Sequence, residues 1–533
     1  MSTFMRRKWL PVAVSLALGA GLAGCGSSGH GNTSTSPQAG PAPTVVSTTP
    51  TNAATGVLNT AEVSATFDQA MDPTTLKSAS FSVNCPAGAE PFGSVTYDPA
   101  THKATFVRVT ESPTNPAQSE VAEPMPANVT CTATISTAAK NSAGVALAKD
   151  VVWTFSTVTD TAFLDEGKNI FRFDTFGDET QWTDTLKMND VIAAAVDPKT
   201  ALAVGLKVDA EALPPSVVAG IQDGSISLTS PDTTLALISL DAVVGIKGTV
   251  ENVNGKSTLT RVGITCALCH STVDNSFAPG IGKRLDGWPN RDLNPGAIIA
   301  LSPALTPEQK AVYNSWGPGM YDPRFNIDGI NGPQVITPAF GLQNIHKIIA
   351  TGDGDDLAYW NRYVSVTQMG GHGNFADPRL GTSGVDITHG SDDLVTAKLP
   401  ALQAYQLSIA APAAPAGSFD TAAAARGKLL FEGKARCISC HSGPEFTDAN
   451  TRLHDPSEVA SEPEAAGVPS YASRSATRKY RTAPLKGAWQ HPPYFHNGSA
   501  ATLDDVVAKY NAKKSLGLTS AEIADVAQYV KSL

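Results

Sequence analysis

Two five-residue motifs are the most reactive part of this 533-residue chain. They are Cys266-Ala267-Leu268-Cys269-His270 and Cys437-Ile438-Ser439-Cys440-His441. Two thiols at this spacing lie on one helical turn, where they can add to the two vinyl groups of a haem, and the adjacent histidine then reaches the iron. The motifs therefore predict two covalently bound c-type haems, with His270 and His441 as proximal iron ligands.

Zinc and a redox-active dithiol are the alternative uses of these cysteines. Structural zinc sites usually place their Cys pairs roughly 12–20 residues apart, whereas these pairs lie about 170 positions apart. A thioredoxin-like pair requires a βαβ context and no histidine. Haem is favoured because both motifs end in histidine and because the N-terminus indicates export.

The N-terminus has the three parts of a secretory signal. Arg6, Arg7 and Lys8 precede an apolar run over residues 9–22 that is short for a membrane span. The run ends in Leu22-Ala23-Gly24-Cys25, which resembles a bacterial lipobox. An ordinary secretory signal followed by a chance cysteine is the alternative.

The lipobox implies that Cys25 is lipidated and becomes the mature N-terminus. We expect a signal peptide over residues 1–24 and a flexible linker over 25–43, where Gly, Ser, Thr and Pro predominate. Gly26 after the lipidated cysteine favours the outer membrane. The predicted location is therefore the cell envelope, with a lipid anchor and with the domains facing the periplasm or the exterior.

Residues 44–157 have the alternating pattern of short β-strands. Apolar side chains recur at every second position and are separated by Pro, Gly and Asn turns, as at Val63, Ala65, Phe67, Phe81, Val83, Cys85, Cys131, Ala133, Ile135, Trp153 and Phe155. This pattern predicts an antiparallel β-sandwich, and the segments 67–73 and 151–156 resemble bacterial Ig-like modules. Cys85 and Cys131 both fall on the apolar phase, which predicts a disulfide; two unpaired core thiols are the alternative.

Two mainly α domains with loops and minor β structure follow this module. The first haem domain is expected over residues 158–410, with an N-terminal extension; residues 190–195 are typical of a helix and residues 235–240 of a strand. Ala411 to Gly417 is expected to be a hinge.

The second haem domain is expected over residues 418–533 and shows clearer helix signals. Asp420 can cap a helix that runs through Leu430, and Thr502 with Asp505 and Thr519 with Glu522 make further cap pairs. Ile523, Val526, Ala527 and Val530 then follow helical spacing. This order of helix, haem motif, loops and terminal helix is the plan of a cytochrome c.

Three segments of the second domain resemble the di-haem cytochrome c peroxidase family, which includes the methylamine dehydrogenase maturation enzyme and, more distantly, rubber oxygenases. The segments are 436–444, 480–487 and 493–503, the last reading Pro-Tyr-Phe-His-Asn-Gly-Ser-Ala-Ala-Thr-Leu. The resemblance is specific over 420–533 and weaker over 258–410. It implies that peroxide or oxygen reacts at one haem while the other relays electrons.

The resemblance also implies a sixth ligand for the second haem, fourteen residues after His496. That position holds Tyr510, where peroxidases have Met and the maturation enzyme has Tyr. An ordinary aromatic on a helix face is the alternative for Tyr510. His496 is a rival ligand, and His491 a weaker one; in the family His496 would instead orient a propionate or bridge the two haem regions.

The open haem is expected to be the first one, but no distal glutamate motif is recognisable. The side chains that can approach its iron are His346, His372, His389, His454 and Met369. Arg284 or Arg291 can hold haem propionates.

The leading hypothesis is an exported di-haem oxidoreductase that uses peroxide, oxygen or an organic compound and exchanges electrons with a partner protein. A di-haem electron carrier without its own substrate, and a surface-binding lipoprotein with a degenerate haem part, are the alternatives. Related enzymes hold calcium between their haem domains, and the sequence leaves open whether this chain does. The formal charge of −10 argues against nucleic-acid binding.

Overall fold

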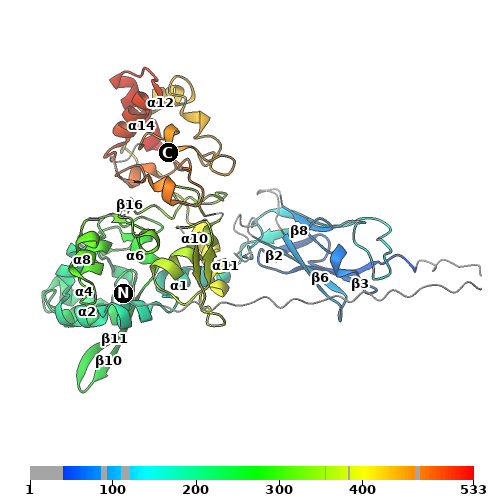
Figure 1. Ribbon diagram of the computed structural model, residues 1–533, viewed down its shortest axis with the longest axis horizontal. Coiled ribbons are helices and arrows are strands. Elements are labelled where there is room, and N and C mark those ends of the chain that lie inside the picture. Colours follow the sequence, from blue (N-terminus) through cyan, green and yellow to red (C-terminus); the bar gives the residue numbers. More distant parts are fainter. Residues whose placement is uncertain (1–39, 86–92, 110–120, 355, 382–383, 463–468) are drawn as a thin grey trace, which may run out of the picture. The chain divides into compact units, whose positions relative to one another are not determined.

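The computed structural model describes residues 40–85, 93–109, 121–354, 356–381, 384–462 and 469–533 (Figure 1). The predicted signal peptide, Cys25 and almost all of the 25–43 linker lie outside these residues. None of the helices in the described ranges is both long enough and apolar enough for a membrane span.

The Ig-like module is a sandwich of two four-stranded sheets, ordered β1-β3-β6-β5 and β2-β8-β7-β4 (Figure 1). Its strands are β1 Val45–Thr49, β2 Ala54–Leu58, β3 Val63–Phe67, β4 Phe81–Asn84, β5 Gly93–Asp98, β6 Lys103–Arg108, β7 Thr130–Ile135 and β8 Val151–Val158. The alternating apolar residues fill the space between the sheets, where the Phe81 ring lies 5.8 Å from the rings of Phe106 and Trp153.

One strand pair of the module differs from the expected antiparallel pattern. β2 runs parallel to β8, because the chain crosses after β1 to the second sheet and enters it beside the last strand. Cys85 and Cys131 are joined by a disulfide, with their Cα atoms 4.2 Å apart. This bond fixes the end of β4 to β7.

The first haem domain is built from short helices and two-stranded ladders. Its helices are α1 Thr161–Phe173, α2 Met188–Ala195, α3 Pro198–Ala203, α4 Pro215–Gln222, α5 Pro231–Ser239, α6 Ala267–His270, α7 Pro295–Ala300, α8 Pro307–Asn314, α9 Phe325–Asp328, α10 Leu357–Tyr363 and α11 Leu399–Ser408. Its strands are β9 Val208–Asp209, β10 Ile246–Val253, β11 Lys256–Ile264, β12 Ser271–Val273, β13 Ile281–Gly282, β14 Arg284–Asp286, β15 Met320–Tyr321, β16 Gln334–Val335, β17 Phe375–Asp377 and β18 Val385–Ile387.

The strand expected over residues 235–240 is wrong, since this segment belongs to helix α5. Ser230 caps the helix through the N–H of Asp232, and Pro231 occupies its first turn. Thr234, Leu235 and Ile238 are all buried. Residues 235–240 are apolar at every position except Ser239, and periodicity alone does not tell such a short apolar run in a helix from one in a strand.

The second haem domain follows the sequence prediction closely. It contains α12 Thr421–Glu432, α13 Leu503–Lys514 and α14 Ser520–Ser532, capped by Asp420, Thr502 and Thr519. Val526, Ala527 and Val530 are buried against Phe431 of α12. The predicted apolar face of the C-terminal helix therefore forms the core of this domain.

Each haem motif follows a helix that contains a glycine. At this glycine the helix crosses a second helix from later in the chain. A side chain at Gly167 of α1 would collide with the carbonyl of Ala401 in α11, and one at Gly427 of α12 with the carbonyl of Asp525 in α14. Close backbone approach therefore requires glycine at both crossings. The predicted N-terminal extension thus begins with α1, the counterpart of α12.

Candidate haem-binding sites

The first Cys-x-x-Cys-His motif lies on the short helix α6, at the end of β11. The Nδ1 atom of His270 lies 3.0 Å from the carbonyl oxygen of Thr337, and because a carbonyl only accepts, Nδ1 carries the proton. The Nε2 atom is thereby left as the metal-binding nitrogen. Burial lowers the pKa of His270, which favours the neutral imidazole that binds iron.

A cavity of about 540 Å³ opens beside this motif and is lined by Cys266, Cys269 and His270. Its wall is mainly apolar and includes Ile336 and Leu342. Such a pocket has the size range and character of a cofactor site.

Three polar side chains of this wall have buried atoms without a hydrogen-bond partner. They are Nε of Arg481, Oε1 of Gln334 and Oγ of Ser365. Buried polar atoms are normally paired, so these atoms fit a ligand with polar groups. A haem fits the donor set: thiols for its vinyl groups, an imidazole for its iron and a guanidinium for a propionate.

Both π-helical turns of the described residues lie on the cavity wall. One spans Thr180–Thr185 and contributes Gln181 and Trp182; the other spans Val364–Gln368 and contributes Ser365 and Gln368. Such turns are rare in proteins as a whole, and those that occur are often found at functional sites. No sequence motif marked these residues.

The second haem domain also contributes to this cavity. Tyr471, Arg481 and His496 line it, although all three lie beyond residue 418. His496 is buried, and its ring stacks on Tyr480 at 4.8 Å between centroids. The structure therefore places the rival ligand His496 at the first haem cavity.

The second motif lies on a 3₁₀ turn over Cys437–Ser439. The Nδ1 atom of His441 lies 3.0 Å from the carbonyl oxygen of Phe446, so its Nε2 is also left for a metal. Burial lowers the pKa of His441. The two motifs thus present their histidines in the same way.

Tyr510 lies on α13 near this second motif. Burial raises its pKa to about 12; the Ala460 backbone opposes this rise, and the thiols of Cys440 and Cys437 add to it. Its ring lies 5.9 Å from that of Phe495. Phe495 has a φ of 65°, unusual for an aromatic residue, and is followed directly by His496. Phe495 therefore lies beside Tyr510, whereas the next residue, His496, lines the first haem cavity.

The remaining predicted ligands of the first haem are dispersed. Only Met369 lines the cavity. His454 lies instead beside Cys440 and Asp448, and His372 stacks on His389 at 5.0 Å. His346 is not part of the lining either.

The four motif cysteines do not converge on a shared zinc site. Among the described residues, only Cys440, Asp448 and His454 bring three metal-binding atoms within 4.8 Å of one another. The first pair lies in the other haem domain, so the haem interpretation retains its advantage over zinc.

Neither of the two arginines predicted near propionates, Arg284 and Arg291, lines the first cavity. The Nε and Nη1 atoms of Arg291 are buried without a partner, and burial lowers its pKa to about 10. Arg284 is instead paired with Asp286 at 2.9 Å, although its Nη2 is also unpartnered.

The carboxylates gathered between the haem domains, Asp322, Asp328 and Asp353, are each paired with an arginine. The presence of calcium, which the sequence leaves open, therefore gains no support from these three residues.

Two protein families match parts of this chain. Residues 39–157 match the Bacterial Ig-like domain family, and residues 479–515 match the RoxA-like, cytochrome c-like family. These matches confirm the predicted Ig-like module and the cytochrome c-like character of the second haem domain.

Two curated relatives are cytochrome-c peroxidases. IdrP1 of Denitromonas iodatirespirans is 34% identical over 152 residues, which are 21% of this chain and 40% of the relative. IdrP2 of Pseudomonas sp. (strain SCT) is 32% identical over 117 residues, which are 17% and 32%. The matches span less than half the length of these relatives. They confirm the predicted resemblance to the cytochrome c peroxidase family and support c-type haem as the cofactor.

A solved structure also aligns. It is a variant of the diheme peroxidase BthA from Burkholderia thailandensis, at 15% identity and a TM-score of 0.27, covering 45% of this chain and 78% of that chain.

Proposed function

We propose that this protein is an exported di-haem c-type cytochrome that reduces peroxide at its first haem and receives electrons through its second. The proposal depends mainly on one observation: both motif histidines have Nδ1 held by a carbonyl, and His270 also faces a cavity whose wall holds unpartnered polar atoms. The resemblance to cytochrome-c peroxidases supports the same assignment.

The bound haem would supply a redox-active iron at each motif. The chain's own part at the first site is to tether the group through Cys266 and Cys269 and to fix the imidazole of His270. Arg481 would pair with a propionate. Ser365 and Gln334 offer a hydroxyl donor and a carbonyl acceptor, which suit a small polar substrate such as hydrogen peroxide.

Reduction of one hydrogen peroxide to two waters consumes two electrons and two protons. We propose a separate donor protein as the source of the electrons. Tyr510 is the proposed sixth ligand of the second haem; it would stabilise ferric iron.

The electron-carrier alternative is favoured by Met369. Its side chain is 3% exposed and lines the first cavity, so a thioether ligand there would close the site to substrate. The two functions differ in the coordination of one haem.

Low-temperature EPR of the oxidised holoprotein separates them. We expect one high-spin and one low-spin ferric signal, and a rapid spectral change when peroxide is added. Replacing Cys266 and Cys269 by Ser should remove the high-spin signal, and replacing Cys437 and Cys440 by Ser the low-spin one. Two low-spin haems that do not react with peroxide would refute the enzyme and leave the carrier.

We also propose that Cys25 carries the lipid that anchors the protein to the cell envelope, with the outer membrane as its site. Cys25→Ser should move the protein from the membrane fraction to the soluble fraction of cells that produce it. Retention of the variant in the membrane would contradict the anchor while leaving the haem proposal intact.

A further inference from the structure

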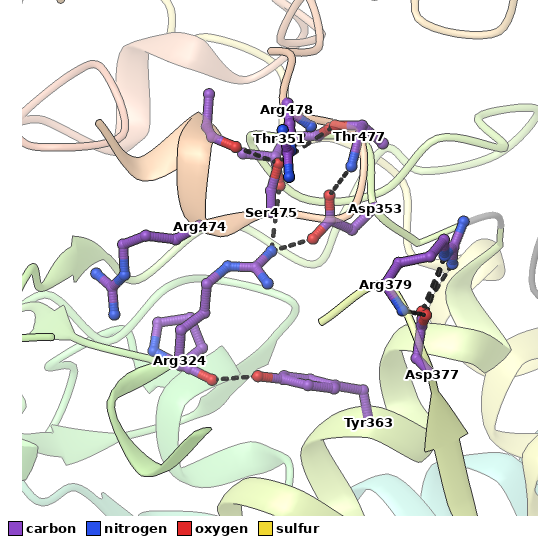
Figure 2. A network of polar contacts seen from close by, with 12 residues as sticks. Arg324, Thr351, Asp353, Tyr363, Asp377, Arg379, Arg474, Ser475, Thr477 and Arg478 are labelled. Atoms are coloured by element: carbon purple, nitrogen blue, oxygen red, sulfur yellow. Dashed lines mark hydrogen bonds and ion pairs between the residues drawn. The ribbon is translucent and has the colours of Figure 1, made fainter. Parts of the chain in front are cut away.

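A buried network of charges connects the two haem domains (Figure 2). Arg324, from the first domain, is 2% exposed; it is paired with Asp353, and its Nη2 lies 3.5 Å from Thr351 Oγ1. Arg474, from the second domain, binds Asp328 at 2.8 Å and Asp322 at 3.1 Å. Charges this deeply buried are held only if each has a partner.

The two arginines meet at one aromatic ring. The guanidinium carbons of Arg324 and Arg474 lie 5.1 and 5.9 Å from the ring centroid of Tyr471. At these distances a guanidinium is attracted to an aromatic face. The ring of Tyr471 also stacks on that of His496, with centroids 6.1 Å apart and an angle of 19°.

Tyr471 and His496 are two of the side chains that the second domain contributes to the first haem cavity. The segment behind them is fixed to the first domain as well. Thr477 Oγ1 donates to the carbonyl of Thr351 at 2.6 Å, close to the Asp353 that pairs with Arg324 (Figure 2). Direct contacts therefore link the ion pairs of Arg324 and Arg474, through the ring of Tyr471, to the cavity wall.

We infer that Arg324 and Arg474 are positioning residues that clamp Tyr471 and so hold the second domain's wall of the first haem cavity in place. The inference depends on the proposed function, since it assigns these residues to the reactive site of that function. We name this set of residues the arginine clamp: the two arginines and Tyr471, with the carboxylate partners Asp322, Asp328 and Asp353.

The physical reason is the cost of an unpaired buried charge. If one partner of such a pair is removed, the other keeps its desolvation penalty and moves toward water or another partner. Movement of Arg474 would release Tyr471, and with it the ring of His496. A misplacement of about 1 Å at a reactive site can lower reactivity roughly a hundredfold.

The test uses the full-length holoprotein with potassium cyanide as the probe of the open haem. Asp328→Asn keeps the size of the side chain, whereas Arg474→Met removes the clamp's charge from the second domain. We expect cyanide affinity at the first haem to fall roughly tenfold in the first variant and further in the second. The low-spin EPR signal of the second haem should be unchanged in both.

The matched control is Asp377→Asn. Asp377 is fully buried and paired with Arg379 at 2.7 Å, but both residues belong to the first domain and neither lines the cavity (Figure 2). It therefore removes a buried carboxylate that is paired with a partly exposed arginine, without releasing the second domain's wall. Its cyanide affinity should match that of the wild type.

Arg474→Lys adds a test that does not depend on whether Arg474→Met folds. Lysine keeps the charge but lacks the planar fork that binds two carboxylates at once, so cyanide affinity should lie between those of the wild type and Asp328→Asn. Wild-type affinity in Asp328→Asn and Arg474→Lys, or an equal loss in Asp377→Asn, would overturn the clamp. If the wild type binds no cyanide, the proposed function fails and the clamp fails with it.

Discussion

The buried carboxyl of Asp178 gives a prediction whose size follows from the structure. Asp178 is fully buried just before the π-helical turn that lines the first haem cavity, and its two oxygens lie 3.3 and 3.2 Å from the backbone nitrogen of Ile264. It thus connects this turn to the strand that leads into Cys266. Burial raises the pKa of Asp178 from 3.8 to about 9; the Ile264 N–H opposes the rise, and Glu179 and Asp174 add to it.

The sign of the effect follows from linkage. Because the folded pKa lies above the unfolded value, the folded state binds the extra proton between pH 4 and pH 9, and stability falls as pH rises through this window. Each pH unit costs about 1.4 kcal/mol for one proton. Between pH 4 and pH 7 the carboxyl therefore costs the folded state about 4 kcal/mol.

Asp178→Asn removes this titration and keeps the shape of the side chain. The free energy of unfolding of the variant minus that of the wild type should increase by about 1.4 kcal/mol per pH unit between pH 5 and pH 8. Urea unfolding of the holoprotein, followed by the haem absorption band, measures this difference. Any change in hydrogen bonding shifts the difference equally at every pH, so only the slope tests the prediction.

Asp184→Asn is the matched control, because Asp184 lies on the same turn with its side chain 54% exposed. Because this variant keeps the buried carboxyl of Asp178, its free energy of unfolding should fall with pH as that of the wild type does. A difference between Asp178→Asn and the wild type that is constant from pH 5 to pH 8 would refute the reasoning, because the carboxyl would then be ionised in the folded protein as well.

Three further predictions concern the haems and the Ig-like module. Cys437→Ala should leave one thioether at the second haem, so this haem remains attached in acidic acetone but its pyridine haemochrome band shifts; extraction of about half of the haem colour would contradict covalent attachment at Cys440. Tyr510→Met should raise the potential of the second haem by on the order of 0.1 V, because a thioether favours ferrous iron; an unchanged potential in a spectroelectrochemical titration would exclude Tyr510 as a ligand. Replacing Cys85 and Cys131 by Ser should lower the stability of the Ig-like module by about 4 kcal/mol, since the disulfide closes a loop with a sequence separation of 46; a calorimetric transition of the module at its wild-type temperature would contradict this estimate.

The elements best predicted from the sequence are those with local signals. Asp420, Thr502 and Thr519 each cap a helix through a contact within three residues, so their spacing is enough to place α12, α13 and α14. The strands of the Ig-like module are equally local, because alternation marks the buried face. Helix α5 shows the limit, since the short apolar run over residues 235–240 fits a helix and a strand equally well.

Of the functional site, the sequence predicted mainly the residues that belong to recognisable motifs. Cys-x-x-Cys-His fixes three residues by spacing, but the opposite wall of the first cavity comes from distant segments. The sequence offers His496 as a rival ligand of the second haem, and the family resemblance implies instead that it orients a propionate or bridges the two haem regions; in the structure it lines the first cavity. Ser365 and Gln334 carry no motif, and only the fold brings their unpartnered atoms there.

A repeated pattern shows why the first haem domain was harder to delimit. Gly167-Lys168-Asn169-Ile170-Phe171 in α1 and Gly427-Lys428-Leu429-Leu430-Phe431 in α12 share Gly, Lys and Phe at the same positions. In both helices the Gly permits the crossing and the Phe is buried. The haem motif begins ten residues after Gly427 but 99 residues after Gly167.

The extra segment in the first domain has a structural consequence at the haem. It contains the π-helical turn over Thr180–Thr185 and helix α5, and its turn lines the first cavity. The second motif has no comparable segment between its helix and its cysteines, and Tyr510 lies near it instead. The two haem domains thus repeat one helix crossing but differ in what surrounds the iron ligand. This difference supports the proposed division of labour between an open haem and an electron-relaying haem.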